Sequence, residues 1–238
     1  MANLHSKRIK GNLVYYDNTG QRWIDAIGPD VTKYILNTAY LPVDDTTGDP
    51  TGFTMTVVEA GAGGDSTVAL SDNTLLITTD NAENDGVNLQ LKGEAFDFAS
   101  GNYVYFGINF QVNDADQTDF LVGLCITDTT LLGGMTDGVY FESLDESTDI
   151  NFVLEKDSTE TTSASAVGTL ADATNVTLEF LFDGTNVDAY VNGTLQTRLA
   201  TTNLPDNEQL TPSIHFLTGE ATANTMAVNW WRVIQINA

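Results

Sequence analysis

The feature that most constrains the fold of this 238-residue chain is the spacing of its apolar residues, which alternate with polar ones in short runs. In the segment 103–112 (YVYFGINFQV), every second residue from Val104 to Val112 is apolar, as expected for a strand with one buried face. Comparable runs recur about every 8–12 residues between Gly, Asn, Asp and Thr, a spacing typical of β-sandwiches. Helical periodicity is nearly absent. We therefore predict an all-β fold whose strands cover 54–59, 75–79, 87–91, 104–112, 120–127, 138–142, 151–156, 175–182, 186–191, 211–217 and 226–236.

The first forty residues have a different pattern. A small hairpin is predicted from Gly11–Tyr16 (GNLVYY) and Gln21–Ile24 (QRWI), joined by a tight turn at 17–20 (DNTG), and 31–40 is expected to be extended. A segment this short cannot enclose a core of its own, so it must lie on the rest of the chain or on another chain. We divide the chain into an N-terminal arm (1–40), a turn-rich linker with two prolines (41–52) and a sandwich domain (53–238).

The charge of the chain is strongly negative and unevenly spread. Thirty-three acidic residues and nine basic ones give a formal net charge of −24, which repels nucleic acid and anionic lipid. The first 33 residues hold five of the basic residues and three of the acidic ones, so this part carries +2 and the remainder −26. Either the terminus is simply solvated, or the arm docks on an acidic partner while the body faces solvent.

Other features concern the compartment in which the protein folds. A single cysteine, Cys125, excludes an internal disulfide, and its apolar surroundings (120–126, FLVGLCI) predict a buried thiol. The first residues contain no apolar core of a secretion signal, and no stretch reaches about 18 consecutive apolar residues. We therefore expect no membrane contact and synthesis in the cytoplasm.

The C-terminal third carries the most recognisable pattern. The segment 176–193 (VTLEFLFDGTNVDAYVNG) pairs two strands around an Asp-Gly turn and ends at an Asn-Gly turn, and 226–236 (MAVNWWRVIQI) follows as a long closing strand. These segments resemble the hairpin and the last strand of concanavalin A-like and laminin G-like jelly rolls. The resemblance implies such a sandwich, preceded here by an extended arm with a small hairpin.

The whole chain, including 7–16 (KRIKGNLVYY) and 25–30 (DAIGPD), also resembles head decoration proteins of tailed bacteriophages. This resemblance implies a non-enzymatic virion protein made in the host cytoplasm, which binds the major capsid protein on the capsid exterior, often as a homotrimer. Burial of additional interface on the assembled lattice would then reinforce the shell. The residues expected to make the capsid contact are Lys7, Arg8, Lys10, Leu13, Tyr15, Tyr16, Trp23 and Ile24.

Two alternatives remain open. A lectin-like module on a virion, which binds host-surface glycans, would use Trp230 or Trp231. These two residues are adjacent in a strand and so point to opposite faces, one into the core and one outward. A glycoside hydrolase needs two carboxyl groups close together, and the nearest candidates lie in Glu142–Glu146 (ESLDE), where Glu142 and Asp145 would be tested first. The spacing of these acids splits them between two faces, and His5 and His215 are too far apart to suggest a triad. We therefore predict no catalytic site.

Three acidic loops raise the alternative of structural calcium, because hard oxygen ligands suit that ion. None contains a complete ligand loop, so we prefer acidic turns that solvate strand ends and predict no cofactor and no metal site. The three groups are Asp44, Asp45 and Asp49; Asp80, Glu83 and Asp85; and Asp114, Asp116 and Asp119.

Overall fold

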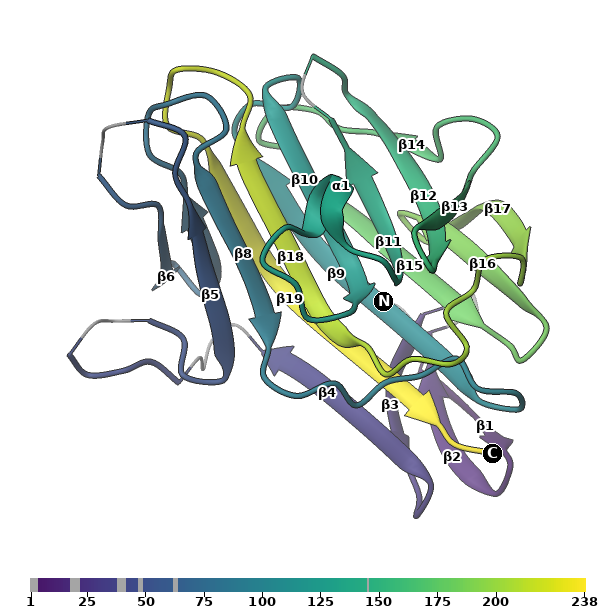
Figure 1. Ribbon diagram of the computed structural model, residues 1–238. Coiled ribbons are helices and arrows are strands. Elements are labelled where there is room, and N and C mark those ends of the chain that lie inside the picture. The colour runs from purple at the N-terminus through teal and green to yellow at the C-terminus, as the bar shows by residue number, and fades with distance from the viewer. Residues whose placement is uncertain (1–3, 18–21, 38–41, 47–48, 62–63, 145) are drawn as a thin grey trace.

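The computed structural model describes residues 4–17, 22–37, 42–46, 49–61, 64–144 and 146–238. The strands form two large sheets that face each other and a third, three-stranded sheet near the N-terminus (Figure 1). Within these ranges the only helix is the short α1 (Leu131–Gly134). The prediction of an all-β sandwich preceded by a small hairpin is therefore confirmed.

One large sheet, which we call the front sheet, has the order β13-β12-β11-β10-β18-β8-β5, and β14 pairs with β12. Its strands are antiparallel throughout, and six of them correspond to runs predicted from the alternation of apolar residues. All eight strands of the front sheet are β5 (Phe53–Val58), β8 (Gly86–Leu91), β10 (Thr118–Cys125), β11 (Gly138–Ser143), β12 (Asp149–Lys156), β13 (Thr159–Thr162), β14 (Gly168–Thr169) and β18 (Thr211–Thr218).

The other large sheet, the back sheet, has the order β17-β16-β15-β9-β19-β7-β6, and β4 pairs with β19. Long strand β19 lies at the centre of the sheet, where it pairs with β9 on one side and with β7 and β4 on the other. The strands are β4 (Val31–Asn37), β6 (Thr67–Ser71), β7 (Thr74–Thr78), β9 (Tyr103–Val112), β15 (Val176–Phe182), β16 (Asn186–Val191), β17 (Thr194–Ala200) and β19 (Thr225–Ile236).

The hydrophobic core lies between the two large sheets. The alternating apolar residues of β9 all point into it, and the Phe106 ring stacks on Phe180 with 5.1 Å between ring centroids. Phe110 of the back sheet meets Phe120 of the front sheet edge to face at 5.3 Å, so aromatic contacts join the two layers. Each such fully buried side chain contributes about 1.5–3 kcal/mol to the hydrophobic free energy of folding.

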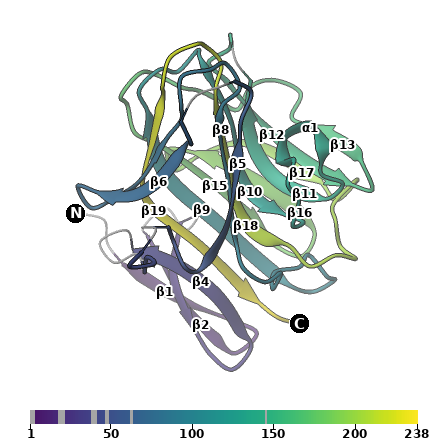
Figure 2. The same ribbon diagram turned by 60° about the vertical axis from the view of Figure 1, so that its left-hand side comes forward.

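The N-terminal segment forms a separate antiparallel sheet of β1 (His5–Ile9), β2 (Asn12–Tyr16) and β3 (Trp23–Ile27), which we call the N-terminal sheet. It packs on the outer face of the back sheet (Figure 2), where Trp23 stacks on Tyr105 at 6.1 Å and contacts Ile234 within one buried cluster. Strand β4, which the predicted division assigns to the arm, pairs with β19 along its whole length. The division into arm, linker and domain itself stays a prediction.

Some predicted details of the N-terminal segment lie outside the described residues. These are the tip of the predicted turn (18–20), the first residue of its second strand (Gln21) and the end of the predicted extended segment (38–40). The flanks of the turn are described, and the Asp17 amide donates a hydrogen bond to the Arg22 carbonyl at 3.0 Å.

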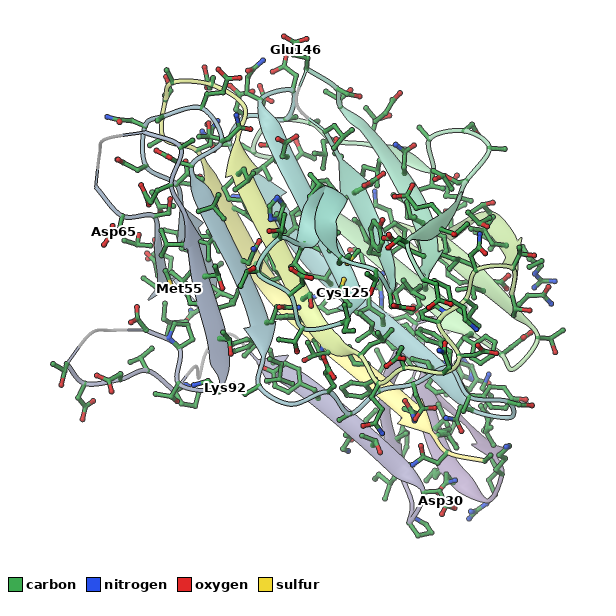
Figure 3. The ribbon with its side chains drawn as sticks, viewed as in Figure 1. Asp30, Met55, Asp65, Lys92, Cys125 and Glu146 are labelled. Carbon is green, nitrogen blue, oxygen red and sulfur yellow. The ribbon has the colours of Figure 1, made fainter. Side chains whose placement is uncertain are left out.

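A loop that contains α1 covers the centre of the front sheet on its outer face. Leu131 and Met135 of this loop pack on Tyr140 and on Cys125, which Figure 3 shows beneath α1. Cys125 is fully buried, as predicted, and burial raises the pKa of its thiol. No helix among the described residues is both long and apolar enough to cross a membrane.

Candidate functional site

The two adjacent tryptophans of β19 point to opposite faces of the back sheet, as predicted. Trp231 has no exposed surface and stacks on Phe53 in the core with 5.8 Å between ring centroids. Trp230 lies on the outer face and is partly exposed. A shift in the pairing of β19 with β9 between Val228 and Trp230 makes Asn229 an extra residue in the strand. This bulge decides which of the two indoles enters the core.

The residue beneath the Trp230 ring, Gly107, is a glycine for a steric reason. A Cβ atom at Gly107 would lie 3.1 Å from the Trp230 ring and 2.4 Å from the Tyr105 hydroxyl oxygen. Gly107 therefore lets the Trp230 ring lie close to the sheet surface.

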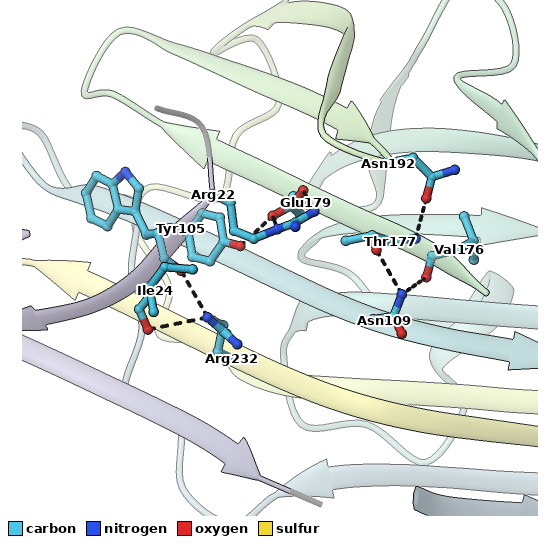
Figure 4. Close-up of polar contacts among 10 residues, drawn as sticks. Arg22, Ile24, Tyr105, Asn109, Val176, Thr177, Glu179, Asn192 and Arg232 are labelled. Carbon is cyan, nitrogen blue, oxygen red and sulfur yellow. Dashed lines mark hydrogen bonds and ion pairs between the residues drawn. The ribbon is translucent and has the colours of Figure 1, made fainter. Parts of the chain in front are cut away.

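Side-chain amides form a connected row beside Trp230 on strands β19, β9 and β15. The Asn109 Nδ2 group donates to Thr177 Oγ1 at 2.8 Å, and the Asn229 Nδ2 group donates to Asn109 Oδ1 at 2.7 Å and to Asn175 Oδ1 at 2.6 Å. The row continues to Asn192, whose Oδ1 accepts a bond from the Thr177 amide at 2.9 Å (Figure 4).

These bonds fix the amide groups at the exposed end of the row. Asn175 and Asn192 are exposed, and the bonds described above use only their Oδ1 atoms. Their Nδ2 groups are thus held in place as hydrogen-bond donors on the outer face.

A buried ion pair borders the same face. Arg22 Nε and Nη2 donate to the two carboxylate oxygens of Glu179 at 2.7 and 3.0 Å, and the Tyr105 hydroxyl donates to Glu179 Oε1 at 2.8 Å (Figure 4). Glu179 has no exposed side-chain surface, whereas 28% of the Arg22 side chain is exposed. The bond to Glu179 raises the pKa of Arg22, and burial raises the pKa of Tyr105, so the phenol stays neutral.

A second arginine lies beneath Trp230. The Arg232 guanidinium carbon is 4.4 Å from the centre of the Trp230 ring, and that of Arg22 is 5.7 Å away. Arg232 Nη1 also donates long hydrogen bonds of 3.4 Å to the carbonyls of Trp23 and Ile24, which ties the N-terminal sheet to the back sheet (Figure 4). Burial lowers the pKa of Arg232, which nevertheless stays charged near neutral pH.

The residues predicted to contact a capsid lie on or beside the N-terminal sheet, and several make contacts within this chain. Trp23 has no exposed surface, so its ring packs on the back sheet instead of facing a partner. Lys10 Nζ donates to the Gly101 carbonyl at 2.5 Å, and Lys7 Nζ lies 5.2 Å from the centre of the Tyr16 ring.

The remaining predicted contact residues have mixed surroundings. Arg8 Nη1 donates to the Gly11 carbonyl at 2.8 Å within the hairpin, and the Ile24 carbonyl accepts the Arg232 bond given above. Leu13 and Tyr15 are partly exposed on the side of the N-terminal sheet that faces away from the sandwich. Their role in partner binding stays a prediction.

The carboxylates weighed for hydrolysis do not share one described surface. Glu142 lies in β11, Asp145 is outside the described residues, and Glu146 lies in the following loop with φ 58°, at one tip of the molecule in Figure 3. Burial, together with the charges of Glu160 and Glu155, raises the pKa of Glu142 to about 7. This proton affinity was not foreseen, because it depends on neighbouring strands.

The two histidines lie in unrelated places. His5 stacks on Tyr16 in the N-terminal sheet at 5.7 Å. His215 is buried on the outer face of the front sheet beneath the α1 loop, where its Nδ1 is bonded to Asn88 Oδ1. Asn88 Nδ2 donates to the Thr129 carbonyl at 2.6 Å, so Asn88 Oδ1 is the acceptor and His215 Nδ1 carries the proton. Burial lowers the pKa of His215 to about 4.

The acidic loops considered for calcium are not arranged as a metal centre. Among the described residues, no group of three or more His, Cys, Asp or Glu side chains could hold a metal ion. The Asp85 carboxylate instead accepts backbone bonds from Ala60 and Ala82 at 2.7 and 2.9 Å, so it orders its own loop. Asp114 lies beside Asp116, and burial with this neighbouring charge raises the pKa of Asp114.

A cleft of about 570 Å³ opens at the edge of the sandwich between β5 and β6. Its apolar wall consists of inward-facing Met55, Val57 and Val68, and Asp49 and Asp65 lie at its rim; Figure 3 marks Met55 and Asp65 there. None of the described residues that line this cleft is aromatic. It offers no stacking surface comparable to Trp230.

No protein-family model matches this chain. No curated protein sequence matches it either. Solved structures do match. The potassium-bound carbohydrate recognition domain of Emp46p is 12% identical, with a TM-score of 0.58, and the match covers 84% of this chain and 98% of that one. The same domain is also known in a metal-free form.

Two further solved structures, one of them a glucanase, have the same fold. An endo-1,3-beta-glucanase from Streptomyces sioyaensis is 10% identical over 90% of this chain and 99% of its own, with a TM-score of 0.59. LamAcat from Zobellia galactanivorans is 15% identical over 84% and 96%, with a TM-score of 0.59. These likenesses confirm the concanavalin A-like jelly roll.

The same likenesses correct one prediction. The sequence alone predicts that the chain is not an enzyme, but proteins of this fold include an endo-1,3-beta-glucanase, so the sandwich by itself does not exclude hydrolysis. None of the solved structures named above is described as a capsid decoration protein, so these likenesses do not support the capsid role.

Proposed function

We propose that this protein binds carbohydrate on the outer face of the back sheet, with Trp230 as the stacking surface. The observation that carries the proposal is the pairing of a partly exposed indole with a row of fixed amides on adjacent strands. Sugar rings present C–H groups that pack on an aromatic face and hydroxyl groups that bond to amides. Such a site can therefore contact both the C–H groups and the hydroxyl groups of a sugar.

The shape of the face suits an extended ligand. Trp230 of β19, Asn109 of β9 and Thr177 of β15 follow one another across the sheet, and Asn192 follows at the end of β16. Adjacent strands lie about 4.8 Å apart, so this row spans about 14 Å. The fold is shared with a carbohydrate recognition domain, which is consistent with a lectin-like role.

The test is a glycan array followed by calorimetric titration of the glycans that are retained. Trp230→Ala is expected to weaken binding at least about tenfold, which corresponds to about 1.4 kcal/mol. Trp230→Phe keeps an aromatic face and should lose less. Tyr15→Ala removes a partly exposed aromatic ring from the N-terminal sheet and serves as the matched control, with unchanged affinity. Equal binding by Trp230→Ala and the parent chain would contradict the proposal.

A second candidate is docking of the N-terminal sheet on a capsid lattice. One observation favours it: the side of this sheet that faces away from the sandwich presents Leu13 and Tyr15 beside Ile27, whose side chain is 56% exposed. In this hypothesis the protein is a trimer on the capsid exterior. Co-sedimentation with empty capsids should then fall when Leu13 and Ile27 are both replaced by Asp. Unchanged co-sedimentation would exclude this surface.

A further inference from the structure

The basic residues of this acidic protein gather on one side of the molecule. Seven of the nine belong to residues 4–37 or to the outer face of the back sheet, together with five of the 33 acidic residues. The rest of the chain holds two lysines, Lys92 and Lys156, against the other 28 acidic residues. The seven basic residues are Lys7, Arg8, Lys10, Arg22, Lys33, Arg198 and Arg232, and the five acidic ones are Asp17, Asp25, Asp30, Glu179 and Asp188.

The same asymmetry holds locally at Trp230. Arg22 and Arg232 both lie within 6 Å of its ring, and the single carboxylate that meets them is Glu179 among the contacts described above. Tyr105 stays neutral, so it adds no negative charge. Glu179 forms an ion pair with Arg22, whereas the charges of Asp17 and Asp25 act on Arg22 and Arg232, respectively, from farther away. Of the two guanidinium groups beside the stacking surface, that of Arg232 forms no ion pair with a carboxylate among the described residues.

The geometry of Arg22 leaves one edge of its guanidinium group available. A guanidinium group has five N–H bonds, and Glu179 uses one on Nε and one on Nη2. Three N–H bonds are therefore not used by Glu179, and 28% of the Arg22 side chain is exposed. Arg22 Nη2 lies near the Asn192–Gly193 turn, where a Cβ atom at Gly193 would be 4.0 Å from it.

From these observations we infer that the carbohydrate bound at Trp230 is acidic, and that a carboxylate of a uronic acid pairs with the uncovered edge of Arg22. This inference rests on the proposed function and names the class of its ligand. A planar carboxylate matches two parallel N–H bonds of a guanidinium group. Glu179 holds Arg22 in the required orientation, and Arg232 supplies the second positive charge that makes the face attractive to an anion.

The remainder of the protein makes this arrangement selective. The rest of the chain, with two lysines and 28 acidic residues, is strongly negative and repels an acidic polysaccharide, so binding is confined to the back-sheet face and orients the molecule. The attraction should weaken as salt is added, because ions screen charges over about 8–10 Å near physiological ionic strength.

The test compares oligosaccharides of galacturonate, guluronate and glucuronate with their methyl esters, which keep the sugar and remove the charge. At least one acid form should bind about tenfold more tightly than its ester at low salt, and the difference should shrink at high salt. The inference fails while the proposed function stands if neutral glycans bind, if this binding is lost in Trp230→Ala, and if the acid forms bind no more tightly than the neutral ones. If no glycan of either kind binds, both fail.

A double substitution tests Arg22 itself. Arg22→Met with Glu179→Gln removes both charges of the pair, so no buried charge is left uncompensated. Binding of the acid form should fall about tenfold, whereas binding of the methyl ester should change less than about twofold. The matched control is Arg198→Met with Asp188→Asn, which removes the other bidentate pair of the same sheet, with bonds of 2.6 and 2.7 Å. Equal losses in both double variants, or an equal loss for acid and ester, would overturn the inference.

Discussion

One buried and one partly buried group on the outer face of the front sheet should make the stability of this protein respond to pH in opposite directions. His215 is neutral in the folded state because burial lowers its pKa to about 4, from 6.5. Between these values the unfolded chain binds a proton that the folded chain does not bind. Stability due to His215 is therefore fully present above pH 6.5 and is lost as the pH falls toward 4. The shift corresponds to about 3 kcal/mol.

Glu142 acts in the opposite sense. Burial and two neighbouring carboxylates raise its pKa to about 7, from 4.5. Between these values the folded chain binds a proton that the unfolded chain does not bind. Stability due to Glu142 is fully present below pH 4.5 and is lost as the pH rises through 7, again by about 3 kcal/mol. The two contributions nearly cancel between pH 4.5 and 6.5, so the parent chain hides both of them.

Single substitutions separate the two contributions. In Glu142→Gln only the contribution of His215 remains. As the pH falls from 7.5 to 4.5, the free energy of unfolding of this variant should therefore decrease by about 3 kcal/mol relative to that of the parent chain. His215→Asn keeps a donor toward Asn88 and should gain stability relative to the parent chain over the same interval, by about 2–3 kcal/mol.

The assay is urea unfolding followed by tryptophan fluorescence at pH 7.5, 6.0 and 4.5. Asp114 and Asp206 also have shifted pKa values, but they are present in every variant and cancel in the differences. Glu155 interacts with Glu142, so its contribution cancels in His215→Asn and is part of the difference measured for Glu142→Gln. If the stability differences between each variant and the parent chain stay constant with pH, the assigned protonation of His215 and Glu142 is wrong.

Three further predictions concern the back sheet. Trp231→Ala should lower the free energy of unfolding by about 3–5 kcal/mol because it empties a core site, whereas Trp230→Ala should cost less than about 1 kcal/mol; urea unfolding at neutral pH measures both. Arg22→Ala alone should destabilise by about 3–5 kcal/mol, since it leaves the Glu179 charge buried without its partner, and the loss should be smaller when Glu179→Gln is added. Gly107→Ala should displace the Trp230 ring and the Tyr105 hydroxyl and lower the free energy of unfolding by about 1–3 kcal/mol. It should also weaken glycan binding as much as Trp230→Ala does. A calorimetric affinity equal to that of the parent chain would show that the position of the ring does not matter for binding.

The sequence was sufficient for the strands that alternate clearly and for the turns between them. The run 103–112 became β9 with its apolar residues in the core, and the Asp-Gly and Asn-Gly turns flank β16, with Gly184 and Gly193 at positive φ. The alternation does not predict strand β17, because it is an edge strand whose two leucines are both partly exposed.

The candidate site could be predicted only in part. The sequence indicated that one of the two tryptophans faces outward, but strict alternation from buried Val228 would have placed Trp230 in the core. The bulge at Asn229 reverses this, and it arises from pairing with β9, which no local pattern reveals. The Arg22–Glu179 pair joins residues 157 positions apart, so its existence depends on the tertiary fold alone.

The central position of β19 has a consequence for biosynthesis. Its partners β4, β7 and β9 are translated long before it, and they cannot join into one sheet until residues 225–236 have left the ribosome. Until then the early strands expose unpaired edges and apolar faces, which favours slow folding and a need for protection from aggregation during synthesis.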